Sequence, residues 1–330
     1  MNKKVILSYL LSLILLAVII SIIDVKKVFE QITKIGFINF VFLSALYSTG
    51  YIFRALRWKS VLKPITDISF KESFFIVNTG FFINALLPAR TGEIARAYIL
   101  SKKKNLGKIK SFSTVLLDRI IDGLTLFFFF VLSVFLIQIP EEFKSMLLIP
   151  AVIFIFGFLF FLKPNKFKFI GRIIAGLFPS MKEKIKYFFN EIKEAGNIFY
   201  SEKKQLVLII FYSILIWLIE ILVFYFSAQF IGIDLGLFHV FLLIVVTGFA
   251  VMIPSGPNYI GTFEAGFVIF FIAFGLNQNS AISLAVLIHL IETVIIIILG
   301  LISMKKLNLS FKNFSEINLS GIKNKIKVIK

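Results

Sequence analysis

Residues 84–96 read NALLPARTGEIAR, and this stretch decides how the rest of the chain is interpreted. An apolar run ends at Pro88, and Arg90, Glu93 and Arg96 follow within eight residues. The apolar run before Pro88 is too short to cross a bilayer alone, since a spanning helix needs about 20 residues. Charges beside a broken apolar segment are typical of sites that face a substrate inside the membrane. The stretch therefore predicts a re-entrant, substrate-facing element.

Composition places the chain in a membrane. Of its 330 residues, 58% are hydrophobic, 16% are charged and 42 are phenylalanine. One globular core cannot hide so many apolar side chains. Only helices or closed barrels satisfy the backbone in hydrocarbon, and several apolar windows reach the length of a spanning helix, which favours helices. The sequence has no cysteine, which excludes disulfides, thiolate nucleophiles and cysteine-ligated metals.

The pattern predicts an all-α fold, a polytopic membrane bundle of six full spans with two broken or re-entrant helical segments. The expected spans lie near residues 5–23, 37–57, 112–138, 146–162, 206–230 and 280–303. The interrupted segments lie at 74–100 and 237–275. A Lys3-Lys4 pair precedes the first span as in a signal peptide, but a small-residue cleavage site is missing, so we expect a retained helix. The integral membrane domain should cover residues 1–304.

Positive charge predicts the sidedness, because cytoplasmic loops are rich in lysine and arginine. The N-terminus and residues 54–73, 90–110, 163–205 and 305–330 hold 31 of the 36 basic residues. The opposite segments hold four, and these segments are 24–36, 139–145, 231–236 and 276–279. We therefore expect both termini in the cytoplasm. This asymmetry accounts for the net charge of +18 without a nucleic-acid partner, since no basic groove sequence lies outside the apolar spans.

The two interrupted segments resemble each other. Thr79-Gly80-Phe81 precedes Pro88, Gly92 and Glu93, while Thr247-Gly248-Phe249 precedes Pro257, Gly261 and Glu264. Each segment follows two expected spans and precedes one, and the two halves face opposite ways. Broken helices at equivalent places in an inverted repeat predict a substrate site near the middle of the bilayer. The expected repeats are residues 1–138 and 146–304.

In the first segment, a helix starting after Pro88 would place Arg90 beside Glu93. The free amides of a helix start and the planar guanidinium group suit a phosphate. The segment therefore predicts an anion site that uses Arg90, Glu93 and Arg96. A salt-bridged cap at the cytoplasmic interface is the alternative.

Ionisable residues also lie inside the expected spans. Asp118 and Asp122 share a helix face, and Arg119 can reach Asp122. Groups at this depth cannot face lipid, so they line a hydrated substrate path or form a static network that locks helices. Glu220 and Glu292 stand among apolar residues, so each must pair, protonate or line a cavity. We expect all four carboxylates to couple protonation to function.

The second segment contains PSGPNYIGTFEAG at 254–266, whose prolines and glycines forbid a continuous helix and let a ligand approach the backbone. We expect Pro257, Gly261 and Glu264 to contact substrate. The alternative is a surface turn with Glu264 in the first turn of the next helix. His289 and His239 are the two histidines, too few for a metal-ligand cluster, so no metal and no cofactor is expected.

Three outlying regions carry basic charge. Arg54 and Arg57, with Trp58, resemble an interfacial anchor at the end of the second span. Residues 163–205 form a basic loop with an amphipathic stretch at 182–199, which would attract anionic lipid or simply be solvated. The basic tail at 305–330 is too short for a catalytic domain.

Three motifs together, LLPARTGEIARAYIL, LLDRIID and PSGPNYIGTFEAG, resemble the lysylphosphatidylglycerol synthase transmembrane region family, also called flippase-like domain proteins. The resemblance covers nearly the whole chain and implies a lipid-translocating module without the soluble aminoacyltransferase domain. The residues carried over are Pro88, Arg90, Gly92, Glu93, Arg96, Asp118, Arg119, Asp122, Pro257, Gly261 and Glu264.

The leading hypothesis is a multi-pass transporter of the cytoplasmic membrane that moves an anionic or polyprenyl-linked lipid. Arg90, Arg96 and Arg119 would hold the headgroup between the repeats. One alternative is an integral membrane transferase that acts on a lipid-linked substrate, although no activated nucleophile or phosphate-binding glycine loop is evident. Another is an accessory subunit of a lipid-modifying enzyme. The expected partners are membrane lipids, with a homo-oligomer or an enzyme partner left open.

Overall fold

The computed structural model describes residues 3–88, 90–162, 203–253 and 255–309, with single residues at 173 and 176. Within these ranges the chain is all-α and has no strand. Long helices occupy the six expected spans: α1 (Lys3–Ile22), α3 (Gly36–Leu62), α6 (Lys108–Leu136), α7 (Glu141–Leu162), α11 (Lys203–Phe230) and α14 (Gln278–Lys306). Four described segments are long and apolar enough to cross a membrane, namely 25–62, 108–136, 203–230 and 278–306. The chain is a helical membrane protein with about four long apolar spans plus shorter apolar helices.

Both interrupted segments are broken where the sequence predicts. The first consists of α4 (Phe70–Leu86) and α5 (Thr91–Lys104). The second consists of α12 (Leu237–Ala250), a short 3-10 turn η4 (Pro257–Tyr259) and α13 (Thr262–Ala273). We call the connection between α4 and α5 the first break and the connection between α12 and α13 the second break.

One helix, α2 (Val25–Ile32), lies where the sequence predicts only an outer loop. The Asp24 side chain caps its start by accepting from the amides of Lys26 and Lys27. Val28 is its buried residue. Eight residues with three charges give too weak an apolar pattern to predict such a helix.

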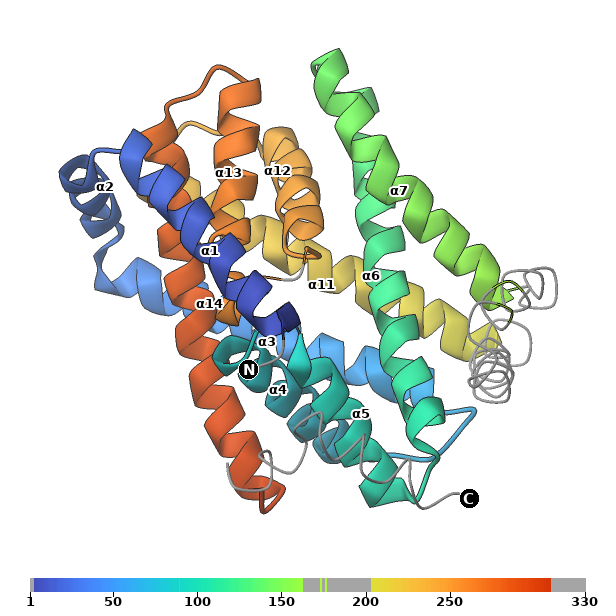
Figure 1. The fold of residues 1–330 in the computed structure, drawn as a ribbon. Helices are drawn as coiled ribbons and strands as arrows, with labels where there is room; N and C mark the ends of the chain where they lie inside the picture. The colour runs from blue at the N-terminus through green and yellow to red at the C-terminus, as the bar shows by residue number, and fades with distance from the viewer. Residues whose placement is uncertain are drawn as a thin grey trace.

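Figure 1 shows how the broken segments fit between the long helices. Helices α6 and α14 run the height of the bundle, with α12 and α13 toward the top of the view and α4 and α5 toward the bottom. The two breaks therefore come together near the middle of the bundle. Helices α3 and α11 cross behind them.

The contacts between helices are reciprocal. Helix α14, which follows the second break, packs on α4, and α6, which follows the first break, packs on α12. Helices α3 and α11, which precede the two broken segments, pack on each other. Within each broken segment the two legs also pack together, α4 on α5 and α12 on α13.

Contacts at the two ends of the bundle join segments that are distant in sequence. At one end, the Asp24 amide donates to Asn279 Oδ1 at 2.8 Å, and the rings of Phe143 and Phe274 meet edge to face. At the other end, Lys104 Nζ lies 3.1 Å from Glu72 Oε2. Burial acts to raise the pKa of Glu72, but the Ser69 amide and the Lys104 ammonium outweigh it, so this pKa lies below its ordinary value.

Glycine makes the first broken segment possible. A Cβ at Gly92 would lie 1.9 Å from the carbonyl oxygen of Gly80, which no side chain can tolerate. Helices α4 and α5 thus touch backbone to backbone at these two residues. The amphipathic stretch at 182–199 and the tail from 310 onward lie outside the described residues.

Candidate functional site

The first break places Arg90 directly before α5. The helix begins at Thr91, slightly later than the predicted start after Pro88, and Arg90 takes the left-handed conformation with φ 56° and ψ 36°. As predicted, Arg90 pairs with Glu93, with Nη1 and Oε1 3.2 Å apart. A non-glycine residue in this conformation is strained and persists only where its surroundings hold it.

The two breaks touch each other through Arg90. Its Nη2 donates to the Val251 carbonyl oxygen at 2.7 Å, and its guanidinium lies 5.6 Å from the centre of the Tyr259 ring. Asn84 adds a second link, since its Nδ2 donates to the Tyr259 hydroxyl at 3.2 Å. The Asn84 Oδ1 accepts the Gly92 amide at 2.7 Å. Asn84 therefore ties α4 to both breaks, a role that the sequence analysis missed.

A buried network of charges lies beside the first break. Arg57 Nε donates to Asp118 at 3.0 Å, and its Nη1 donates to Asp122 at 2.6 Å. The Arg57 side chain is only 1% exposed. Trp58 is fully buried, and its ring lies 4.0 Å from the Arg96 guanidinium.

The prediction of an interfacial anchor at Arg54, Arg57 and Trp58 is therefore wrong. Helix α3 continues to Leu62 and packs on α4, α6 and α11, so this end of it is inside the bundle. The signal that could have corrected the prediction was the pair of carboxylates at Asp118 and Asp122, because buried carboxylates require cationic partners.

Arg96 and Arg119 complete the network. Arg96 Nη1 donates to Asp118 at 2.8 Å, and Arg119 Nη1 lies 3.1 Å from Asp122. Arg119 Nε also lies 3.7 Å from a Glu93 oxygen. The predicted pairing of Arg119 with Asp122 is confirmed, and both aspartates are enclosed by arginines.

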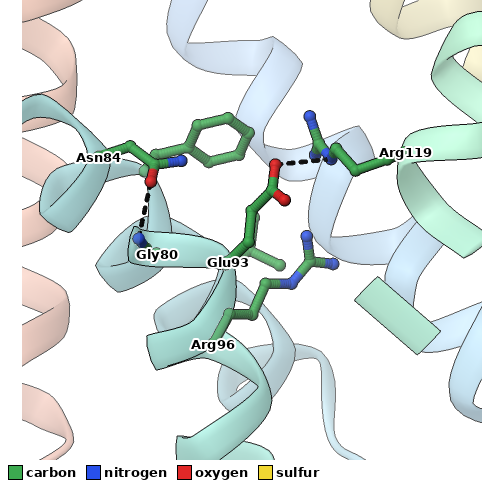
Figure 2. A pocket seen from close by; sticks show the side chains of 8 residues that line it. Gly80, Asn84, Glu93, Arg96 and Arg119 are labelled. Carbon is green, nitrogen blue, oxygen red and sulfur yellow. Dashed lines mark hydrogen bonds and ion pairs between the residues drawn. The ribbon is translucent and has the colours of Figure 1, made fainter. Parts of the chain in front are cut away.

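A pocket opens between α4, α5 and α6, with Asn84, Glu93, Arg96 and Arg119 on its wall (Figure 2). It holds about 220 Å³ of empty space, part of it open to the surroundings. Val77, Gly80, Phe81 and Gly92 form the rest of the lining. Among the described residues, Nε and Nη2 of Arg96 are buried donors without a hydrogen-bond partner. Buried unpaired donors are costly, which makes this pocket a place where an acceptor would bind favourably.

The second break has a different chemistry. Glu264 lies in the first turn of α13, as the sequence alternative stated, and its Oε2 accepts the Gly261 amide at 2.7 Å. Its other oxygen lies 2.6 Å from His289 Nδ1. Part of the turn is buried, because Glu264 is 6% exposed and Ser12 of α1 accepts the Gly256 amide, whereas Ile253 and Ile260 are exposed. Pro257 is the first residue of η4, and Tyr259 is the last.

The remaining predicted carboxylates lie on the α3 side of the bundle. Glu220 pairs with Arg54, whose guanidinium faces the rings of Tyr51 and Phe81. Glu292 lies near Glu220 and Tyr47, without an ion pair in the described residues. The structure thus brings Arg90, Glu93, Arg96 and Arg119 together, whereas Glu220, Glu292 and Glu264 belong to other clusters. No group of three metal-ligating side chains occurs among the residues that were described.

The chain is similar to known proteins. The lysylphosphatidylglycerol synthase TM region family matches residues 5–300. The chain belongs to this family. The match includes both breaks and the Glu264–His289 pair. It also includes the arginine network, which consists of Arg57, Arg96 and Arg119 with Asp118 and Asp122, so the whole site lies within the family region.

Three archaeal proteins are among those to which this chain is similar. The UPF0104 membrane protein MJ1595 of Methanocaldococcus jannaschii is 29% identical over 75% of this chain and 78% of its own length. The UPF0104 membrane protein PH1989 of Pyrococcus horikoshii is 29% identical over 80% and 85%. Glycosyltransferase AglD of Haloferax volcanii is 20% identical over 83% of this chain but only 49% of its own length. No solved structure matches the chain.

Proposed function

We propose that this member of the lysylphosphatidylglycerol synthase TM region family translocates a lipid with an anionic or polyprenyl-linked headgroup across the cytoplasmic membrane. The headgroup binds between two inverted repeats, residues 1–138 and 146–304, at the place where the two breaks meet. The observation that carries the proposal is the contact of Arg90 with Val251 and Tyr259 beside a pocket with unpaired arginine donors.

Reciprocal packing supports the inverted repeat. Each helix that follows a break packs on the first leg of the other broken segment, and the helices that precede the broken segments pack on each other. An inverted repeat with a two-fold axis through the contact of the breaks would relate these pairs. Such repeats with broken helices are the architecture that places substrate sites near the bilayer midplane.

Contacts at the two ends support a topology with both termini in the cytoplasm. The predicted outer segments meet through Asp24 and Asn279 and through Phe143 and Phe274. The predicted cytoplasmic segments meet through Glu72 with Lys103 and Lys104. In this topology the α4–α5 segment enters from the cytoplasm, and the α12–α13 segment enters from outside.

The charge of the network supports an anionic ligand. Four arginines, 57, 90, 96 and 119, face three carboxylates, Glu93, Asp118 and Asp122. One positive charge is left over, and burial makes an unbalanced charge costly. Arg96 and Arg119 line the pocket together with Asn84 and Glu93, and guanidinium groups suit a phosphate group while the acyl or prenyl chains stay in lipid.

Transport can be tested in proteoliposomes with fluorescent lipids. The panel should contain phosphatidylglycerol, its aminoacylated form, a polyprenyl phosphate and a zwitterionic lipid. We expect the protein to move at least one anionic lipid and Arg96→Ala to abolish that movement. Translocation equal to that of empty vesicles for every lipid would refute the proposal.

The Haloferax relative is named a glycosyltransferase, which supports the transferase alternative. About half of that protein lies outside the match, so its printed activity does not pass to this chain directly. The alternative predicts a modified lipid when purified protein in detergent meets a lipid-linked sugar and an acceptor. Transport alone predicts no new product, because detergent offers no second compartment.

An accessory role makes a third prediction. Deletion of 182–199 would then abolish recruitment of a lipid-modifying enzyme, while alanine at Arg90 and Glu93 would leave recruitment intact. The transport proposal predicts the opposite dependence for lipid movement.

A further inference from the structure

The second break holds a chain of hydrogen bonds that lies apart from the arginine network. Glu264 Oε1 and His289 Nδ1 are 2.6 Å apart, and His289 Nε2 and Asn258 Nδ2 are 2.7 Å apart. Asn258 Nδ2 also donates to Thr293 Oγ1 at 2.7 Å. The His289 and Glu264 side chains are 11% and 9% exposed. We call Glu264, His289 and Asn258 the histidine triad.

The aspartates of the arginine network are poor proton acceptors by comparison. Asp118 contacts three arginines, at positions 57, 96 and 119, and Asp122 contacts Arg57 and Arg119. A proton on either carboxylate would leave buried guanidinium groups without their counter-charge. These two residues fit the static network that the sequence left as an alternative.

We propose that the histidine triad is the proton-binding site that couples proton uptake to movement of the second break. The coupling rests on the proposed transport function, whereas the proton binding itself does not. Imidazole is the side chain whose charge ordinarily changes near neutral pH. With a neutral ring, these distances let Nδ1 donate to Glu264 and Nε2 accept from Asn258.

Proton uptake changes the partner that His289 needs. A proton added to Nε2 turns this atom into a donor that faces the donor amide of Asn258. The amide must turn so that Oδ1 accepts from Nε2, and Nδ2 then leaves Thr293 Oγ1. The added charge is balanced by Glu264, so the protonated pair is neutral overall.

Asn258 transmits this change because of its place in the chain. It takes the left-handed conformation with φ 52°, and so does the next residue, Tyr259, with φ 58°. Tyr259 is the residue that meets Arg90 and Asn84 across the two breaks. Rotation of the Asn258 amide therefore acts on strained backbone next to the contact of Tyr259 with Arg90 and Asn84. This contact would have to open during transport.

Other ionisable groups lie on α14 and on the elements packed against it. They are Tyr259 on η4, Glu264 on α13, Glu292, Lys305 and Lys306 on α14, Tyr47, Tyr51 and Arg54 on α3, Glu220 on α11, Lys71 and Glu72 on α4, and Lys26, Lys27 and Glu30 on α2. Among these described groups, Glu264 alone forms an ion pair with the His289 ring.

Proton binding can be measured without transport. The chain has only two histidines, so their signals can be assigned with one variant. Protein labelled with 15N-histidine is titrated in detergent, and His239→Gln assigns the signals. With the measurement run from about pH 5 to 8, where imidazole ordinarily changes charge, we expect Nε2 of His289 to take up a proton while Nδ1 keeps its own. Glu264→Gln should weaken proton uptake by His289, since the carboxylate favours the charged ring. Glu30→Gln, far along the surface of α2, is the control. A ring that keeps one state across this range would overturn the proposal.

Coupling is measured in proteoliposomes with and without a pH gradient. We expect the gradient to change the rate of lipid movement in the wild type at least threefold and to have no effect in His289→Gln, with thermal unfolding confirming that the variant folds. If wild-type protein moves no lipid, the proposed function fails, and the titration still decides the proton site. If the wild type moves lipid at the same rate with and without the gradient, the coupling is refuted.

Discussion

Arg57 shows how much the buried charge network depends on one side chain. It is the residue that joins α3 to both aspartates of α6, and it also reaches Ser213 of α11 at 3.3 Å. Its position could not be read from the sequence, because an arginine near the end of an apolar helix resembles an interfacial anchor. What decides between the two roles is whether carboxylates on another helix reach the same depth.

Replacing Arg57 should therefore destabilise the protein. Arg57→Leu leaves Asp118 and Asp122 with fewer cationic partners, and breaking a buried pair costs about 3–5 kcal/mol. Thermal unfolding in detergent measures the loss. Lys63→Leu is the control, because its pair with Asp67 is exposed and should matter by about 1 kcal/mol or less. Equal effects of the two variants would contradict the buried network.

Arg96 offers a second test at the residue scale. Arg96→Lys keeps the positive charge but removes the Nε donor and the planar group beside Trp58. We expect bound anionic lipid to fall about tenfold or more in native mass spectrometry, because the fork that suits phosphate is gone. Lys71→Arg, at the start of α4, is the control. Lipid retention equal to that of the wild type would remove Arg96 from the headgroup site.

At the scale of the element, the first broken segment depends on two glycines in contact. Gly92→Ala puts a methyl group 1.9 Å from the Gly80 carbonyl oxygen, so α4 and α5 must separate. We expect the variant to lose most of its folded yield in size-exclusion chromatography. Gly50→Ala is the matched control, since its Cβ would meet Ile219 at an ordinary 3.8 Å. Normal folding of Gly92→Ala would mean that the two helices do not touch there.

Much of the structure of the broken segments could be predicted from the sequence. Pro88 and the glycine-rich 254–266 stretch mark the two breaks, because proline and glycine interrupt helices whatever surrounds them. The pairing of Arg119 with Asp122 follows from helical spacing alone, and the same spacing predicted the pairing of Arg90 with Glu93, although Arg90 lies just before α5. The contact of Arg90 with Tyr259 did not follow, because it joins residues 169 positions apart through tertiary packing. The same holds for the Asn84 links and the histidine triad.

At the scale of the whole molecule, the topology makes a direct prediction. The chain lacks cysteine, so each introduced cysteine reports one position. In intact cells we expect an impermeant maleimide to label Lys26→Cys from outside and to label Lys103→Cys only after lysis. Labelling of both positions in intact cells, or the reverse pattern, would contradict the proposed sidedness.

Under the proposed function, lipid crosses where the two breaks meet, so the contact between Asn84 and Tyr259 must open. The test joins Asn84→Cys and Tyr259→Cys with a short bifunctional thiosulfonate reagent, because their parent side chains touch across the breaks. Each single-cysteine variant serves as a control. We expect cross-linking to stop lipid translocation in proteoliposomes and reductant to restore it. Translocation that continues at the same rate in the cross-linked protein would contradict it.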